Sequence, residues 1–166
     1  MASQATTIRV NTAYLHTALD PIYREAMLGE HEAELALLDL RKPLYRQLYV
    51  EEIVAPLFAE LAPPTLEKTR QALKYLLHVP PGPGLAPACQ LFGVALSECV
   101  PLLNLIWSVL FPDEDREIPA GWRYVDRAKS LNYHQTRDFY SSSPQFLDGA
   151  WERLEARLCA SLNSSG

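Results

Sequence analysis

The longest apolar stretch of the chain runs from Leu85 to Phe111 and contains a single charged residue, Glu98. On a helical wheel its polar residues gather in one narrow sector, and the rest of the circumference is apolar. These polar residues are Gln90, Ser97, Asn104 and Ser108. A helix that is apolar nearly all round is buried, either in a protein core or in a membrane.

Two features favour a protein core over a membrane. Glu98 lies near the middle of the stretch, where a membrane would make its charge costly, and the amphipathic segments on both sides need a shared core. Pro101 lacks the amide that would donate to the carbonyl of Ser97, so a kink is expected there. The stretch is therefore predicted to form one kinked central helix with halves at 88–99 and 101–111.

Apolar residues at helical spacing predict further helices before this stretch. Asn11 is the expected N-cap of a first helix. Asp20-Pro21 is the expected start of a second helix, which ends at Gly29 or continues to Leu40.

Prolines mark the limits of the next two predicted helices. Pro43 begins one of them, and Pro56 is expected to kink or end it. Thr65 is the expected N-cap of the other, which ends at a connector rich in proline and glycine, 79–87.

The chain after Phe111 is more polar and carries its apolar residues in shorter segments. We expect a short helix at 120–131 and a loop with buried aromatic anchors at 132–143. Ser143-Pro144 predicts the start of a last helix, through an N-cap and a proline at the first helical position. The apolar residues of that helix fall at near-heptad spacing: Leu147, Trp151, Leu154, Leu158 and Leu162.

No segment of useful length alternates between apolar and polar residues, and only a short extended piece is expected, at Thr6–Val10. The chain is therefore predicted to be all-α. We expect a single domain over 1–166, with six to eight helices bundled around 85–111. The two ends, 1–10 and 163–166, are expected to be flexible.

Composition fits one globular domain, and the cysteines indicate a reducing cellular compartment. The 166 residues are 48% hydrophobic and 21% charged, and the net charge of −5 argues against nucleic acid or an anionic membrane as partner. On a single helix Cys89 and Cys99 would lie about 15 Å apart along the axis, too far for a disulfide. With Cys159 they are an odd number of cysteines, which fits free thiols in the cytoplasm. The N-terminus lacks the pattern of a signal peptide.

Catalytic and metal-binding patterns are not found. The four histidines, His16, His31, His78 and His134, do not pair at helical spacing, and no cysteine spacing matches a zinc site. His31 and Glu34 share a helix face, but an acidic, solvated segment is the better interpretation. No glycine-rich phosphate loop or nucleophile elbow is present. We therefore expect no cofactor, no metal and no catalytic residues.

One cluster of aromatic and basic residues, between positions 122 and 140, stands out as a candidate binding surface. Its members are Trp122, Arg123, Tyr124, Arg127, Tyr133, His134, Arg137 and Tyr140. Arg, Tyr and Trp are the residues that most often dominate protein interfaces. An anionic small ligand is the alternative. Nucleic acid is disfavoured because residues 113–140 contain six acidic residues against five lysines and arginines.

The leading hypothesis is a non-enzymatic protein that binds another protein, as an adaptor, an assembly chaperone or a regulatory subunit. The C-terminal helix offers a second contact, for a homo-oligomer. The competing hypothesis is a helical small-ligand or cofactor binder that uses the polar stripe of the apolar helix, Gln90, Ser97, Glu98 and Asn104. An enzyme with Glu98 as a buried acid or base is third.

Overall fold

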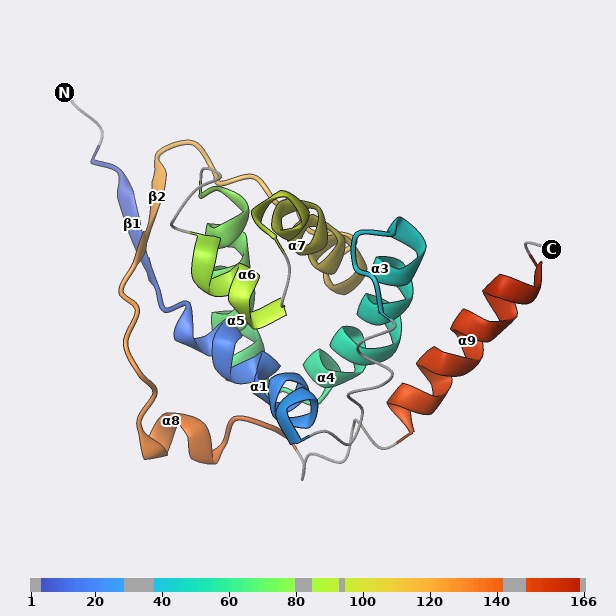
Figure 1. Cartoon of the computed structure of the whole chain (residues 1–166). Coiled ribbons are helices and arrows are strands. Elements are labelled where there is room, and N and C mark those ends of the chain that lie inside the picture. The colour runs from blue at the N-terminus through green and yellow to red at the C-terminus, as the bar shows by residue number, and fades with distance from the viewer. Residues whose placement is uncertain (1–3, 29–37, 80–84, 93–94, 142–148, 165–166) are drawn as a thin grey trace.

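The computed structural model describes residues 4–28, 38–79, 85–92, 95–141 and 149–164. Within these residues the chain is mostly helical and has one small sheet of two parallel strands, β1 (Thr6–Val10) and β2 (Trp122–Asp126) (Figure 1). The expected all-α fold is therefore right for the bulk of the chain but misses the sheet. Figure 1 shows the helices pointing in several directions around a common core.

The two strands are far apart in the sequence but lie side by side, with Thr6 opposite Trp122 and Val10 opposite Asp126. The extended piece expected at Thr6–Val10 is confirmed, and it is held in a sheet rather than being part of a flexible lead-in. The helix expected at 120–131 is wrong, because its first half is β2. Aromatic and β-branched residues favour a strand, but the partner that makes this one a strand is distant in the sequence.

Helix α1 (Ala13–Leu28) begins where expected and is not interrupted at Asp20-Pro21. The Asn11 side chain accepts a hydrogen bond from the amide of Ala13, at 3.0 Å. Pro21 lies inside the helix, so the prediction of two separate helices is wrong. Ala18 and Leu19 are buried just before it, and this packing holds the helix together through the proline. The choice between an end at Gly29 and a continuation concerns residues 29–37, which lie outside the described ranges.

Three consecutive segments form one helical path: α3 (Pro43–Tyr49), the π-helical turn η1 (Val50–Val54) and α4 (Ala55–Ala59). Pro56 therefore does not end the helix. Directly before Pro56, the amide of Ala55 bonds to the carbonyl of Val50, five residues back. This wider turn is a recognised way to accommodate a disrupted hydrogen-bond ladder.

Helix α5 (Pro63–Leu77) starts three residues earlier than predicted, with Ala62 as its N-cap. Thr65 is inside the helix and buried, so its prediction as the cap is wrong. Proline is well suited to the first helical position, since it lacks an amide that would have no partner there. The carbonyl of Thr65 instead accepts the hydroxyl of Thr69, at 2.8 Å.

The apolar stretch forms two helices, α6 (Ala86–Phe92) and α7 (Leu96–Leu110), and the break lies before Leu96 rather than at Pro101. Ala95, the N-cap of α7, has an extended backbone with φ −70 and ψ 159. Pro101 lies inside α7 on its exposed side, where water can satisfy the carbonyl left without a donor. The helix is therefore not broken at Pro101, and the predicted halves 88–99 and 101–111 are replaced by α6 and α7.

Helix α7 lies at the side of the core, with one side buried and the other exposed. Its inner residues are buried against α4, α5, α6 and η1: Cys99, Leu102, Leu103, Ile106 and Trp107. Its opposite side, with Ser97, Pro101 and Ser108, is exposed. The predicted central position of this helix is thus corrected. No helix in the described ranges is both long enough and apolar enough for a membrane crossing.

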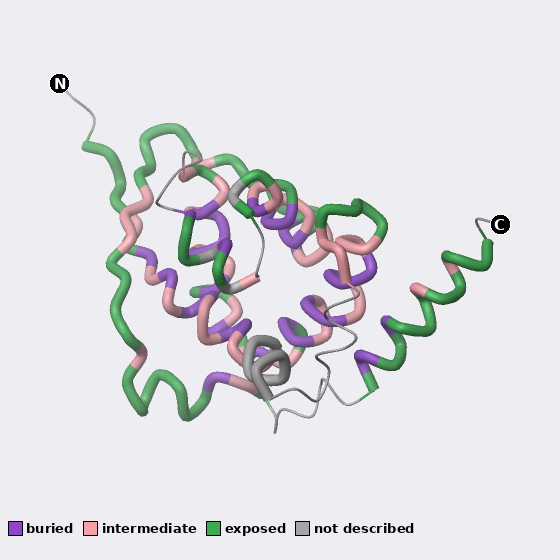
Figure 2. Tube along the Cα trace, viewed as in Figure 1, coloured by how far each residue is buried: buried purple, intermediate pink, exposed green. Residues whose placement is uncertain are grey.

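A short helix, α8 (Tyr133–Arg137), lies in the segment predicted to be a loop. The last helix, α9 (Ala150–Ser164), is attached through its first half, where Trp151 and Leu154 are buried. Figure 2 shows that burial stops along α9, whose second half extends away from the other helices. Leu162, near its end, is 62% exposed. The predicted start at Ser143-Pro144, and Leu147, lie outside the described residues.

Charge pairs reinforce the attachment of α9 to η1. The Arg157 guanidinium lies 2.7 Å from the Glu51 carboxylate and 2.9 Å from that of Glu52, and Arg153 lies 3.5 Å from Glu52. Arg157 and Gln47 hold the pKa of the Glu51 carboxyl below its usual range, the Gln47 hydrogen bond having the larger effect.

Asp126, at the end of β2, connects the sheet to the start of α1. Its carboxylate accepts hydrogen bonds from the Thr12 amide, at 3.3 Å, and from the Thr12 hydroxyl, at 3.0 Å. A carboxylate at a helix N-terminus satisfies a free amide and interacts favourably with the helix dipole. His16, one turn further along α1, is half-buried.

Truncation of Trp151 tests the packing of α9. Trp151→Ala is expected to lower the free energy of unfolding by about 3–5 kcal/mol, the usual cost of removing a large buried aromatic side chain. The matched control on the same helix is Leu162→Ala, which should change it by less than about 0.5 kcal/mol because Leu162 is exposed. Urea denaturation measures both, and similar values for the two variants would contradict this packing.

Removal of the Asp126 carboxylate tests the link between sheet and helix. Asp126→Ala is expected to destabilise the protein by about 1–2 kcal/mol, because the Thr12 amide and hydroxyl lose their acceptor. Asp138→Ala, which removes an exposed carboxylate, is the control and should have little effect. Chemical denaturation of both variants provides the comparison.

Stability should fall at mildly acidic pH partly because of His16. Burial lowers the pKa of His16, and the nearby Asp126 carboxylate offsets this only in part. The unfolded chain, with a histidine pKa of about 6.5, therefore binds the proton more readily, so this contribution destabilises the fold as pH falls below about 6.5. His16→Gln should show a smaller loss of melting temperature between about pH 7.5 and 5.5. The exposed-site control His134→Gln should behave like the unmodified protein.

Candidate protein-interaction site

The β1–β2 sheet has one face against α5 and one toward solvent. In β1, Val10 is buried and Ile8 is half-buried, whereas Arg9 between them is exposed. Alternate residues of a strand point to opposite faces, so Arg9 marks the outer face. Arg9 lies opposite Val125 in the register. Arg123, two residues before Val125, therefore shares this outer face and is also exposed.

The chain beyond β2 stays extended and lies beside the end of β1. The Arg127 amide donates to the Val10 carbonyl at 2.8 Å. The Asn11 side chain bonds the Lys129 backbone in both directions, donating to its carbonyl at 2.9 Å and accepting from its amide at 3.1 Å. These bonds fix the backbone of 127–129 while the side chains of Arg127 and Lys129 remain exposed.

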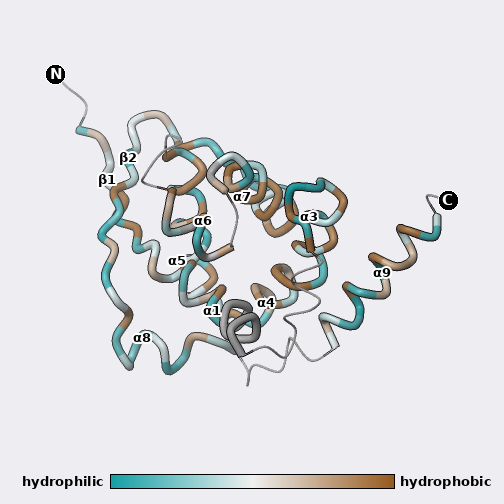
Figure 3. Tube along the Cα trace, in the orientation of Figure 1, coloured by the Kyte–Doolittle hydropathy of each residue, from teal (hydrophilic) through white to brown (hydrophobic). Residues whose placement is uncertain are grey.

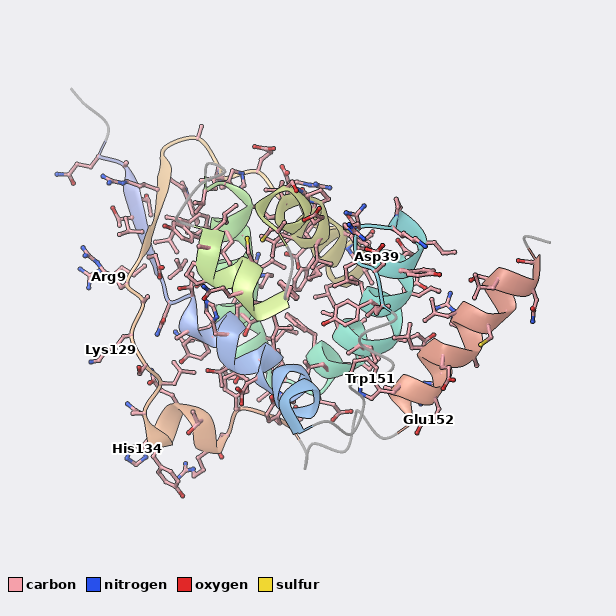
Figure 4. The ribbon with its side chains drawn as sticks, viewed as in Figure 1. Arg9, Asp39, Lys129, His134, Trp151 and Glu152 are labelled. Carbon is pink, nitrogen blue, oxygen red and sulfur yellow. The ribbon has the colours of Figure 1, made fainter. Side chains whose placement is uncertain are left out.

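Four exposed cationic side chains therefore lie along this edge, and we call them the basic row: Arg9, Arg123, Arg127 and Lys129. Figure 4 shows Arg9 and Lys129 projecting outward along the same edge, with His134 further along it. None of the four forms an ion pair with a residue in the described ranges. In a protein of net charge −5, these unpaired cations create a local patch of positive potential.

Helix α8 presents an exposed aromatic ring next to this edge. Asn132 and Gln135 form a capping box, in which each side chain accepts the other's amide at 2.9 Å. This reciprocal cap explains how a helix of one turn forms without any buried residue. It places Tyr133, which is 71% exposed, on the surface.

The segment after α8 is fastened to the core by Phe139. This side chain is buried and stacks on Tyr14, with ring centroids 6.2 Å apart. Its carbonyl accepts the amide of Ala62 at 3.0 Å, and the Ser141 amide donates to the Glu60 carbonyl at 2.8 Å. The segment between β2 and Phe139 is thus held at both ends, as the prediction of buried aromatic anchors implied.

The predicted interface residues divide into an exposed set and a structural set. The exposed set is Trp122, Arg123, Arg127, Tyr133 and His134. Tyr124 is half-buried on the inner face of the sheet, which contacts α5. Tyr140 is half-buried, pairs with Leu61 in an isolated bridge and packs on Phe139. Arg137 is exposed but lies 2.9 Å from the Asp138 carboxylate.

Arg9 was missed as a site residue, and Lys129 was not included in the predicted set. Arg123, Arg127 and Lys129 occupy alternate positions with Val125, a spacing that indicates one face of an extended chain. This signal is in the sequence, but it has meaning only once the segment is known to be extended. Figure 3 shows that the segment leading to and including α8 is largely hydrophilic, in contrast to the apolar helices α4 and α7.

The polar stripe lies on the outside of α6 and α7. Gln90 and Ser97 are exposed. Asn104 donates to the Val100 carbonyl at 2.9 Å and accepts from the Arg116 guanidinium at 2.6 Å. The amide group of Asn104 is therefore already hydrogen-bonded within the chain, on the outer side of α7. Glu98 is half-buried in the first turn of α7, where the helix dipole favours a negative charge.

The described residues were also compared with the requirements of a metal site and of a reactive cysteine. Among the described residues no three His, Cys, Asp or Glu side chains gather as metal ligands, and His31 and Glu34 lie outside those ranges. Burial, reinforced by a hydrogen bond to Cys89, raises the pKa of the Cys99 thiol to about 12. Cys99 is thus a poor nucleophile at neutral pH.

Comparisons with known proteins do not assign the chain to a family. No protein-family model, no curated protein and no solved structure matches it.

Proposed function

We propose that the chain is a non-enzymatic protein-binding protein that captures an acidic, extended segment of a partner on the basic row and the adjacent exposed aromatic residues. A role as adaptor, assembly chaperone or regulatory subunit fits such a surface. The observation that carries the proposal is the exposure of four cations without ion-pair partners among the described residues, on a protein whose net charge is −5.

Charge spacing favours an extended ligand. Alternate residues of an extended chain lie about 6.6 Å apart, so Arg127 and Lys129 match carboxylates placed at every second residue of a peptide. Arginine adds bidentate hydrogen bonds to carboxylates, which a simple point charge does not supply. The sheet and the Asn11 bonds hold the backbone rigid, which reduces the entropy lost on binding.

Exposed aromatic residues supply the apolar part of the interface. Trp122 is 46% exposed and Tyr133 is 71% exposed. Such residues are enriched where interfaces concentrate their binding energy. Tyr133 follows Lys129 on the segment that carries the basic row and supports a mixed surface, with acidic and apolar side chains in the partner. Trp122 alternates with Arg123 in β2 and therefore lies on the other face of the sheet.

The basic row is tested with a fluorescently labelled, unstructured peptide that has glutamate at alternate positions. The double variant Arg123→Ala with Arg127→Ala should weaken binding at least about tenfold, the effect of losing interface arginines. Melting temperature should be nearly unchanged because both side chains are exposed. Added salt should weaken binding in the unmodified protein.

The matched control is Arg41→Ala with Lys42→Ala, which removes two exposed cations elsewhere on the surface. Figure 4 shows Asp39, the ion-pair partner of Arg41, far from Lys129 across the molecule. Equal loss of binding in both double variants would mean that only net charge matters. Tighter binding of single-stranded DNA than of the peptide would make the basic row a nucleic-acid site and would reject the proposal.

A further inference from the structure

Ser130 is an exposed serine at the end of the basic row. Arg127 stands three residues before it and Lys129 directly before it. The residue lies outside the helices and strands, and no hydrogen bond in the described ranges uses its hydroxyl. The Ser130 hydroxyl is therefore available to an external reagent, and two members of the basic row stand beside it.

This spacing matches a charge pattern by which many protein kinases select a serine. Such kinases place carboxylates where they pair with an arginine three residues before the acceptor, and charge patterns of this kind discriminate between substrates. In the sequence, two hydroxyl residues have an arginine at this distance: Ser130 follows Arg127, and Thr12 follows Arg9. The charge pattern alone therefore leaves two candidate acceptors.

Burial separates these two residues. Thr12 is 7% exposed, and its hydroxyl donates to the Asp126 carboxylate at 3.0 Å. Ser130 is exposed. A kinase has to place the acceptor oxygen in line with the γ-phosphorus of ATP, which requires a side chain that can enter the kinase cleft. The fold thus withdraws Thr12 and presents Ser130.

We propose that Ser130 is a phosphorylation site for serine kinases that recognise basic residues on the amino-terminal side of the acceptor. The Ser130 hydroxyl oxygen attacks the γ-phosphorus of ATP, and the bond from that phosphorus to the bridging oxygen of ADP breaks. The hydroxyl proton passes to the aspartate base of the kinase, and ADP leaves. Phosphorylation at Ser130 does not depend on the proposed partner.

The residues that the kinase reads are already on the surface. Arg127 and Lys129 are exposed, and Figure 4 shows Lys129 projecting outward. The backbone of Lys129 is held by two bonds to the Asn11 side chain, and both are exposed to solvent. Exposed hydrogen bonds with few buried contacts open locally. Recognition therefore uses this side of the acceptor, since Leu131 on the other side is half-buried.

Phosphorylation also changes the charge of the basic row, a consequence that rests on the proposed function. A phosphoserine carries about −1.5 to −2 charges at pH 7 and three strong acceptor oxygens. On Ser130 this group stands next to Lys129 and three residues from Arg127. It competes with the carboxylates of a partner for the same cations. The phosphorylated protein is therefore expected to bind an acidic segment more weakly.

The test incubates the full chain with magnesium ATP and the active catalytic domain of a calmodulin-dependent protein kinase, whose substrates carry arginine three residues before the acceptor. Mass spectrometry of the intact protein and of its peptides gives the number and place of the phosphates. We expect a single phosphate, on Ser130, with Thr12 unmodified. Ser130→Ala should abolish it and leave the melting temperature nearly unchanged, since the side chain is exposed.

Two arginine variants separate recognition from general charge. Arg127→Ala should lower kcat/KM for the phosphorylation of Ser130 at least about tenfold, because the kinase loses a charged contact. Arg41→Ala removes an exposed arginine elsewhere on the surface and should leave kcat/KM nearly unchanged. Ser130 left unmodified in the folded protein, or an equal loss in both variants, would overturn the proposed site.

The peptide with alternate glutamates distinguishes this site from the proposed function. Phosphorylated protein should bind the peptide at least about tenfold more weakly than unmodified protein. Equal binding before and after phosphorylation would refute the competition between phosphate and partner. Failure of the unmodified protein to bind the peptide would reject the proposed function, whereas the phosphate on Ser130 is decided by mass spectrometry alone.

Discussion

The parallel pairing of β1 with β2 is the contact on which the position of the candidate site depends. The connection between the two strands contains every helix from α1 to α7, so closing it costs considerable chain entropy. Burial of Val10 and the bonds from Thr12 to Asp126 offset this cost. The same pairing determines that Arg9 and Arg123, which are far apart in the sequence, lie on one face.

Packing also explains why three prolines are tolerated inside helices. A proline in a helix interior costs about 3 kcal/mol or more, whereas each fully buried large aliphatic residue contributes about 1.5–3 kcal/mol. Next to Pro56, both Ile53 and Leu57 are 0% exposed. Next to Pro101, Leu102 is also 0% exposed. Two or three such neighbours outweigh one proline, so the helices continue and adjust locally.

The break between α6 and α7 has consequences for both structure and chemistry. It turns the polar side of the apolar stretch outward, where Asn104 and Arg116 bond one another. It also places Cys89 of α6 and Cys99 of α7 in the same buried core. Burial raises the pKa of the Cys99 thiol and keeps it protonated at neutral pH, which is the opposite of the environment of a catalytic cysteine.

The sequence by itself determined the helical character of the protein and most of its core. Periodicity identified Trp151 and Leu154 as inward-facing, and the Ile53, Leu102 and Ile106 segments as apolar, because burial follows local pattern. It also located the segment that carries Trp122, Arg123 and Tyr133. Tertiary structure alone decided that Trp122–Asp126 is a strand, because its partner β1 lies at the other end of the chain. It likewise decided which aromatic residues face outward and where the apolar stretch breaks into α6 and α7, since neither long-range pairing nor a break between two helices leaves a local signal.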